Sequence, residues 1–132
     1  MVAHILIVDD DRTTRFRLRS ILESDGYTVS EATNGAEALF LIRTLPIQLV
    51  ITDMNMPIMN GTELLVCVQQ EAPEMKVIVI SGACESTESL GFLPTVKMLG
   101  AFAAIPKPLS ASAVRAAVMT ALQTDPQVES AQ

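Results

Sequence analysis

The sequence predicts a doubly wound α/β domain, in which one mostly parallel sheet is covered by helices on both faces. Short runs rich in Val, Ile and Leu alternate along the chain with longer segments of helical period, which is the pattern of strand–helix–strand units. The first, third and fourth of these runs are almost continuously apolar, as strands buried on both faces are. The 132 residues hold five such runs and about five helical segments, so we expect a single domain.

Each predicted element has its own signals. The strands are expected at His4–Val8, Tyr27–Ala32, Ile47–Thr52, Met75–Ile80 and Ala101–Ile105. Four helices are expected at Arg12–Ser24, Gly35–Leu45, Gly61–Glu71 and from a cap at Ser110 or Ser112 to about Gln123. Gly26 follows the first helix and Pro46 the second, and both residue types end helices. The fifth strand has the lowest β-propensity because three of its five residues are alanine.

Composition and charge exclude several classes of function. Fifteen acidic and nine basic residues give a net charge of −6, which argues against a grip on nucleic acid through this domain. Apolar runs such as Ile5–Val8 and Val77–Ile80 have four residues and the longest have five, which is too short for a membrane span. No signal peptide is visible, and Cys67 and Cys84 lack the spacing of a metal site. We therefore expect a cytoplasmic protein with two reduced thiols.

Polar side chains stand where the predicted strands end. The residues at or just after these ends are, in chain order, Asp9, Asp10, Asp11, Asp53, Ser81 and Lys107. Acids in such positions can be solvated turn residues, but ligands of open α/β sheets also bind at this edge. Carboxylates gathered in one cleft repel each other unless a cation joins them, and ligand sets made only of oxygen suit Mg²⁺. The set fits phosphoryl transfer to an aspartate, with an amine and a hydroxyl to bind the phosphoryl oxygens.

Four stretches of the chain resemble the receiver domain of two-component response regulators, as found in the chemotaxis regulators. They are Ile5–Asp11, Ile51–Gly61, Val77–Gly82 and Pro106–Pro108, and the second contains the family pattern D-x-x-M-P-x-M-x-G without a miss. The resemblance runs from about residue 5 to residue 122 and implies a flavodoxin-like fold. We expect a receiver domain at residues 1–123, with the polar residues 124–132 as a tail or the start of a linker.

The resemblance implies a role for each residue that matches the family pattern. Asp53 matches the phospho-accepting aspartate, Ser81 the hydroxyl switch position and Lys107 the family's lysine. The implied phosphodonor is a sensor histidine kinase or a phosphotransfer domain. The domain is then not an enzyme in its own right, although it catalyses its own phosphorylation and dephosphorylation in part. The implied output is an effector domain or a downstream protein, with no contact to nucleic acid or membrane from this domain.

The resemblance also implies a metal site. Asp9 and Asp10 match the acidic pair that binds Mg²⁺, with Asp10 as the direct ligand and Asp9 acting through water. Asp53 and the backbone carbonyl of Asn55 would complete the site.

Two features depart from the family pattern. Ala104 stands where the family carries a switch aromatic, and we interpret Phe102, two residues earlier, as a packing residue, with a substitute switch role as the alternative. Ser81 and Lys107 are 26 residues apart, several more than is common in receivers. The extra residues fall in Glu85–Leu99, where a glycine and a proline would interrupt a regular helix. We expect a short, broken or delayed fourth helix there, and unconventional signalling through it.

Other functions stay open on the sequence alone. A pseudo-receiver would bind partners without being phosphorylated. An aspartyl-phosphate phosphatase of the haloacid dehalogenase type would need a second acid where Asn55 stands, and room for a cap domain. A nucleotide-binding domain would need a glycine-rich loop after the first strand, and none is present.

A run of four arginines lies in the first predicted helix. Arg12, Arg15, Arg17 and Arg19 form the only local basic run of the chain. We expect either a solvated helix face or, as in related regulators, a docking site for the phosphodonor.

Overall fold

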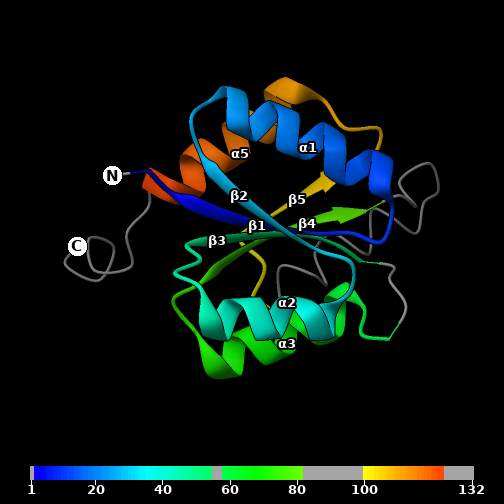
Figure 1. Ribbon diagram of the computed structural model, residues 1–132, viewed down its shortest axis with the longest axis vertical. Helices are drawn as coiled ribbons and strands as arrows, with labels where there is room; N and C mark the ends of the chain where they lie inside the picture. The colour runs from blue at the N-terminus through cyan, green and yellow to red at the C-terminus, as the bar shows by residue number, and fades with distance from the viewer. Residues whose placement is uncertain (1, 55–57, 82–99, 124–132) are drawn as a thin grey trace.

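A computed structural model of the chain has the predicted doubly wound α/β fold (Figure 1). The structure describes residues 2–54, 58–81 and 100–123. Five parallel strands form one sheet in the order β2-β1-β3-β4-β5, and the described part of the chain contains four helices. The irregular helix expected within 85–99 lies outside the described residues.

The elements follow the chain in regular alternation. The strands are β1 (His4–Val8), β2 (Thr28–Ala32), β3 (Leu49–Asp53), β4 (Lys76–Ser81) and β5 (Ala103–Pro106). The helices are α1 (Arg12–Ser24), α2 (Gly35–Thr44), α3 (Gly61–Glu71) and α5 (Ala111–Gln123).

Alternating strand residues divide the core into two layers, one on each face of the sheet. Figure 1 shows α1 and α5 on one face and α2 and α3 on the other. On β1, Ile5 and Ile7 join the core beneath α1 and α5, whereas Leu6 and Val8 join the core on the α2 and α3 side. All four side chains are buried, and a fully buried side chain of this size contributes about 2 kcal/mol. The continuous apolar runs of the sequence are therefore strands covered on both sides.

Polar side chains cap the helices at their amino ends. Asp11 accepts hydrogen bonds from the first-turn N–H groups of α1, and Asn34 does the same for α2. Asn60 and Glu63 form a reciprocal capping box at α3. Of the two serines expected to cap α5, Ser110 is the one that does so, because its Oγ accepts from the N–H of Ala113 at 3.3 Å. These bonds satisfy N–H groups that have no partner within the helix.

Strand boundaries differ from the prediction by one or two residues, for a local reason. β2 begins after Tyr27, whose N–H donates to the carbonyl of Leu22 at 3.2 Å. β3 begins at Leu49, two residues after Ile47, whose N–H donates to the carbonyl of Leu45 at 2.8 Å. These N–H groups close turns. Apolar patterning does not distinguish a residue in a strand from one in the turn before it.

The chain order places a crevice of the sheet beside β1. From β1 the chain moves to one side to form β2, then crosses to the other side to form β3. The connections leaving β1 and β3 therefore diverge, and ligands of open α/β sheets bind at such a switch point. Asp9 follows β1 and Asp53 ends β3, so two acids predicted from the sequence flank this point.

Candidate functional site

Three strand ends bring four of the predicted site residues together. One carboxylate oxygen from each of Asp9, Asp10 and Asp53 lies within 4.8 Å of the other two. The Nζ atom of Lys107, which follows β5, lies 3.8 Å from Asp9 Oδ2 and 3.7 Å from Asp53 Oδ1. We call Asp9, Asp10 and Asp53 the acidic cluster.

Asp9 is the most buried member of the acidic cluster, with no exposed surface. Its Oδ1 accepts a hydrogen bond from the N–H of Asp11 at 2.8 Å. Its Oδ2 is buried and has no hydrogen-bond partner among the described residues. Burial raises the pKa of Asp9 to about 6; the Asp11 N–H bond and Lys107 lower it, and the charges of Asp53 and Asp10 add to the rise.

The acidic cluster fits a hard divalent cation. Its donors are all carboxylate oxygens, which Mg²⁺ prefers to nitrogen or sulfur. A buried carboxylate oxygen without a hydrogen-bond donor is stabilised by a bound cation, and Asp9 Oδ2 is such an atom. Asp10 is exposed, so the cluster is open to solvent on one side. Asp9, Asp10 and Asp53 are therefore the side chains that could hold the metal.

The backbone around Asp53 is fixed by close packing against the start of α3. Asp53 is 5% exposed, and its main-chain oxygen accepts from Thr52 Oγ1 at 2.9 Å. The N–H of Gly61 donates to the carbonyl of Met54 at 3.1 Å. A Cβ atom at Gly61 would lie 2.3 Å from the main-chain oxygen of Asp53, a distance that only glycine permits. This contact explains physically why the motif after Asp53 ends in glycine.

Lys107 directly follows the carboxyl end of β5, in the short loop that leads into α5. Its side chain is 28% exposed and points its ammonium group at two carboxylates. The Lys107–Pro108 peptide bond is cis. Leu109 is buried, and its carbonyl accepts a hydrogen bond from Arg17 Nη2 at 2.8 Å. The loop that carries Lys107 is thus tied to α1.

Two predicted site residues are less fully described. Ser81 is the last residue of β4 and pairs with Pro106, so its backbone stands at the same edge as Asp53 and Lys107. The side chain of Ser81 lies outside the described part of the structure, as does Asn55 as a whole.

The position where the family carries its switch aromatic lies on β5 and is occupied by Ala104. Ala104 lies on β5, opposite Val79 of β4. Phe102 precedes the strand; its N–H donates to Val77 at 2.8 Å and its ring centroid lies 5.8 Å from Lys76 Nζ. It packs against the core at the amino-terminal end of β4, away from the acidic cluster. This placement supports the interpretation of Phe102 as a packing residue.

An arginine–glutamate network on α1 and β2 escaped the sequence analysis. Arg15 Nε donates to Glu31 Oε1 at 2.9 Å, and Arg15 Nη1 donates to the main-chain oxygen of Asp9 at 2.8 Å. Arg19 also pairs with Glu31. Partial burial of Glu31 opposes its ionisation, but the hydrogen bonds from Arg19 and Arg15 outweigh it and lower the pKa of Glu31. Three of the four arginines, including Arg17, thus have intramolecular partners, so this part of α1 is not simply a solvated basic face.

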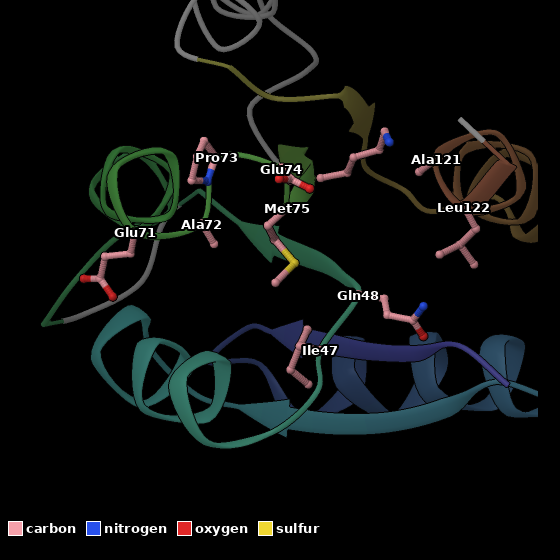
Figure 2. Close-up of a pocket in the computed structure, with 10 residues that line it drawn as sticks. Ile47, Gln48, Glu71, Ala72, Pro73, Glu74, Met75, Ala121 and Leu122 are labelled. Atoms are coloured by element: carbon pink, nitrogen blue, oxygen red, sulfur yellow. The ribbon is translucent and has the colours of Figure 1, made fainter. Parts of the chain in front are cut away.

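A pocket at the opposite edge of the sheet has different chemistry. Figure 2 shows it between the start of β3 and the end of α5. Its volume is about 580 Å³. Ile47, Met75 and Leu122 supply apolar surface, and Gln48 also lines the pocket. Glu71, which also lines it, is paired with Arg43 at 2.6 Å. Glu74 and Lys76 also line it, but the described residues of the pocket do not include three carboxylates that converge as those of the acidic cluster do.

Comparison with known proteins identifies the chain as a receiver domain, in agreement with the strand-end acids of the site. Residues 5–119 match the model of the response regulator receiver domain. The transcriptional regulatory protein GlrR of Escherichia coli is 32% identical over 121 residues, covering 92% of this chain and 26% of GlrR. The aerobic respiration control protein ArcA of Escherichia coli is 52% identical over 58 residues, covering 44% of this chain and 24% of ArcA. The chain thus spans about a quarter of the length of these curated relatives.

A solved structure supports the assignment at the level of the fold. The CheY-like receiver domain protein of Methanospirillum hungatei JF-1 superposes with a TM-score of 0.81 at 33% identity, covering 93% of this chain and 95% of that one. The fold and the strand-end acids define a receiver, a module of two-component signalling. The chain belongs to the response regulator receiver domain family.

Within the described residues, no helix has both the length and the apolar character needed to cross a bilayer.

Proposed function

We propose that Asp53 accepts a phosphoryl group from a phosphohistidine on a sensor histidine kinase or a phosphotransfer domain, in a reaction that depends on Mg²⁺. One observation carries the proposal. The Asp53 carboxylate is nearly buried at the switch point of the sheet, with Lys107 Nζ 3.7 Å from its Oδ1 and two further carboxylates beside it. A lone solvated turn acid would have neither neighbour.

The transfer is a single displacement at phosphorus. A carboxylate oxygen of Asp53 forms a bond to phosphorus while the P–N bond of the donor breaks, and the bonding electron pair leaves with the imidazole nitrogen. Lys107 neutralises charge on the phosphoryl oxygens, because its ammonium group already lies beside the accepting carboxylate. We assign a hydrogen bond to one phosphoryl oxygen to the Ser81 hydroxyl, from its position at the end of β4.

Mg²⁺ is the proposed cofactor. Asp10 and Asp53 are its proposed direct ligands, with Asp9 acting through water and the backbone carbonyl of Asn55 completing the set. When bound, the cation offsets the mutual repulsion of the acidic cluster and the charge of the phosphoryl oxygens. The buried Asp9 Oδ2, which has no hydrogen-bond donor among the described residues, supports this assignment.

Signalling follows from the added charge at one edge of the sheet. Phosphorylation shifts a two-state equilibrium of the domain, and the domain's own residues later direct a water to phosphorus, which releases phosphate and restores Asp53. We place the receiver at residues 1–123, with 124–132 as a tail or linker, and the protein in the cytoplasm. Its output is an effector domain or a downstream protein. Ala104 requires that the switch work without the family's aromatic on β5.

The test uses a small phosphodonor in place of the kinase. The full chain is incubated with acetyl phosphate or phosphoramidate, with Mg²⁺ or with EDTA, and its intact mass is followed over time. We expect one phosphoryl adduct, formed in Mg²⁺ and absent in EDTA and in Asp53→Asn. Asp11→Asn is the matched control, because Asp11 caps α1 in the same loop but lies outside the acidic cluster. An adduct that persists in Asp53→Asn would refute the assignment. No adduct, with folding intact, would favour a pseudo-receiver.

A further inference from the structure

Arg15 on α1 contacts the acidic cluster through the backbone. Its Nη1 donates a hydrogen bond of 2.8 Å to the main-chain oxygen of Asp9, and its side chain is only 16% exposed. Its Nε donates to Glu31 Oε1 on β2 at 2.9 Å. The guanidinium group is therefore held at two points, one on each of two neighbouring strand ends.

This contact completes the restraints on the residue that begins the acidic cluster. The N–H of Asp9 donates to the carbonyl of Ala32 at 3.1 Å, and its Oδ1 accepts from the N–H of Asp11 at 2.8 Å. Arg15 holds the remaining polar backbone atom of Asp9. With all three fixed, both the carboxylate of Asp9 and the peptide that leads to Asp10 have a defined orientation.

Glu31 keeps Arg15 in place. It is ionised at neutral pH, since the hydrogen bonds from Arg19 and Arg15 outweigh its partial burial and lower its pKa. The planar fork of arginine can donate to Glu31 and to Asp9 at once, through nitrogens in a fixed relative geometry. A lysine has one donor nitrogen on a flexible stem and cannot reproduce both bonds in that geometry.

From these contacts we propose that Arg15 is a positioning residue for divalent-cation binding. It holds the turn that carries Asp9 and Asp10 in the geometry that the cation requires, and Glu31 aligns it. The inference rests on the proposed Mg²⁺ site and goes beyond it, because Arg15 itself contacts neither the cation nor the phosphoryl group. Residues that orient metal ligands typically change metal affinity by about 10- to 100-fold when they are replaced.

Arg19 provides a matched control for Arg15. Both arginines lie on α1 and both pair with Glu31. Arg19 donates in addition to Glu23 and to the carbonyl of Val29, not to Asp9. Replacing either one breaks a bond to Glu31, but only the replacement of Arg15 releases the backbone of Asp9.

The experiment measures Mg²⁺ binding to the unphosphorylated chain by isothermal titration calorimetry. Wild type, Arg15→Lys, Arg15→Met and Arg19→Lys are compared, and urea unfolding of each variant shows that it is folded. We expect both Arg15 variants to weaken Mg²⁺ binding about tenfold. Arg19→Lys is expected to stay within about twofold of wild type. Because lysine keeps the charge but not the fork, failure of Arg15→Lys to restore binding separates positioning from simple charge.

Each other outcome overturns the inference in a recognisable way. Mg²⁺ binding by Arg15→Lys at wild-type strength would show that the fork is dispensable. Equal weakening in Arg15→Lys and Arg19→Lys would assign the effect to the Glu31 network as a whole. Absence of Mg²⁺ binding in the wild type would remove the proposed metal site, and the positioning role would fall with it.

Discussion

Replacement of Asp9 by asparagine should stabilise the metal-free protein at neutral pH. Asp9 is fully buried, and burial raises its pKa from its ordinary value of 3.8 to about 6. The folded state therefore binds the proton of Asp9 more tightly than the unfolded state does. Its ionisation costs stability as pH rises from about 4 to about 6, and the full cost is present at pH 7. The difference between the two pKa values corresponds to about 3 kcal/mol.

Asparagine removes this charge and keeps an oxygen that can accept from the N–H of Asp11. The pKa of about 6 already includes the attraction to Lys107, 3.8 Å from Asp9 Oδ2. The buried amide of asparagine keeps part of the desolvation cost, so we expect a net gain of about 1–3 kcal/mol. Urea unfolding in EDTA at pH 7 and at pH 5 measures it. The gain should shrink at pH 5, where much of the Asp9 population in the folded wild type is protonated. Mg²⁺ should stabilise the wild type more than Asp9→Asn.

Asp10→Asn is the matched control, since Asp10 is exposed and has little burial cost to remove. A metal-free Asp9→Asn protein that is no more stable than wild type at pH 7 would refute the reasoning. A gain of the same size at pH 5 would also refute it, because that gain could not come from ionisation.

Substitutions at Gly61, Glu31 and Lys107 test the packing behind Asp53, the ion pair on β2 and the electrostatics of the acidic cluster. Gly61→Ala should lower the free energy of unfolding by about 2–3 kcal/mol in urea titrations, because its Cβ would lie 2.3 Å from the main-chain oxygen of Asp53. A change below about 0.5 kcal/mol would contradict this close approach. Glu31→Gln should lower the free energy of unfolding at pH 7 but much less at pH 3.5. The pKa of Glu31 lies below its ordinary value of 4.5, so its ionised carboxylate stabilises the fold above pH 4.5 and this stabilisation is lost as pH falls. Equal losses of stability at both pH values would count against the ion pair. Lys107→Met should slow formation of the phosphoryl adduct yet tighten Mg²⁺ binding in calorimetry. The change removes an ammonium group that lies 3.8 Å from the Asp9 carboxylate and 3.7 Å from that of Asp53. Weaker Mg²⁺ binding would contradict the assigned electrostatics.

The fold could be predicted because the sequence shows both the apolar runs of buried strands and the helical period of the segments between them. Runs such as Ile5–Val8 are apolar at every position because helices cover both faces of the sheet. The boundaries were less predictable. Tyr27 and Ile47 are as apolar as strand residues, but their N–H groups close turns.

The acidic cluster could be predicted because parallel strands end at one edge, so sequence position there becomes spatial position. The prediction that Asp9, Asp10 and Asp53 converge at one edge of the sheet is confirmed by their geometry, and Lys107 lies beside two of them. Their chemical roles stay predictions.

The role of Arg15 could not be read from the sequence. Its two partners lie on different elements, and Glu31 is 16 residues away in the chain. A run of arginines on an exposed helix has the same appearance whether it is solvated, docks a partner or holds a neighbouring loop. Only the positions of the Asp9 carbonyl and the Glu31 carboxylate distinguish these cases.

The most direct test of the central claim is to locate the phosphoryl group on the chain. After reaction with a small phosphodonor and Mg²⁺, borohydride reduces an aspartyl phosphate to homoserine, and peptide mass spectrometry then identifies the residue that changed. If Asp53 is the phosphoacceptor, homoserine appears at position 53 and the aspartates at positions 9 and 10 are unmodified. Reduction at position 9 or 10, or none at position 53 in a protein that carries the phosphoryl adduct, would contradict this assignment.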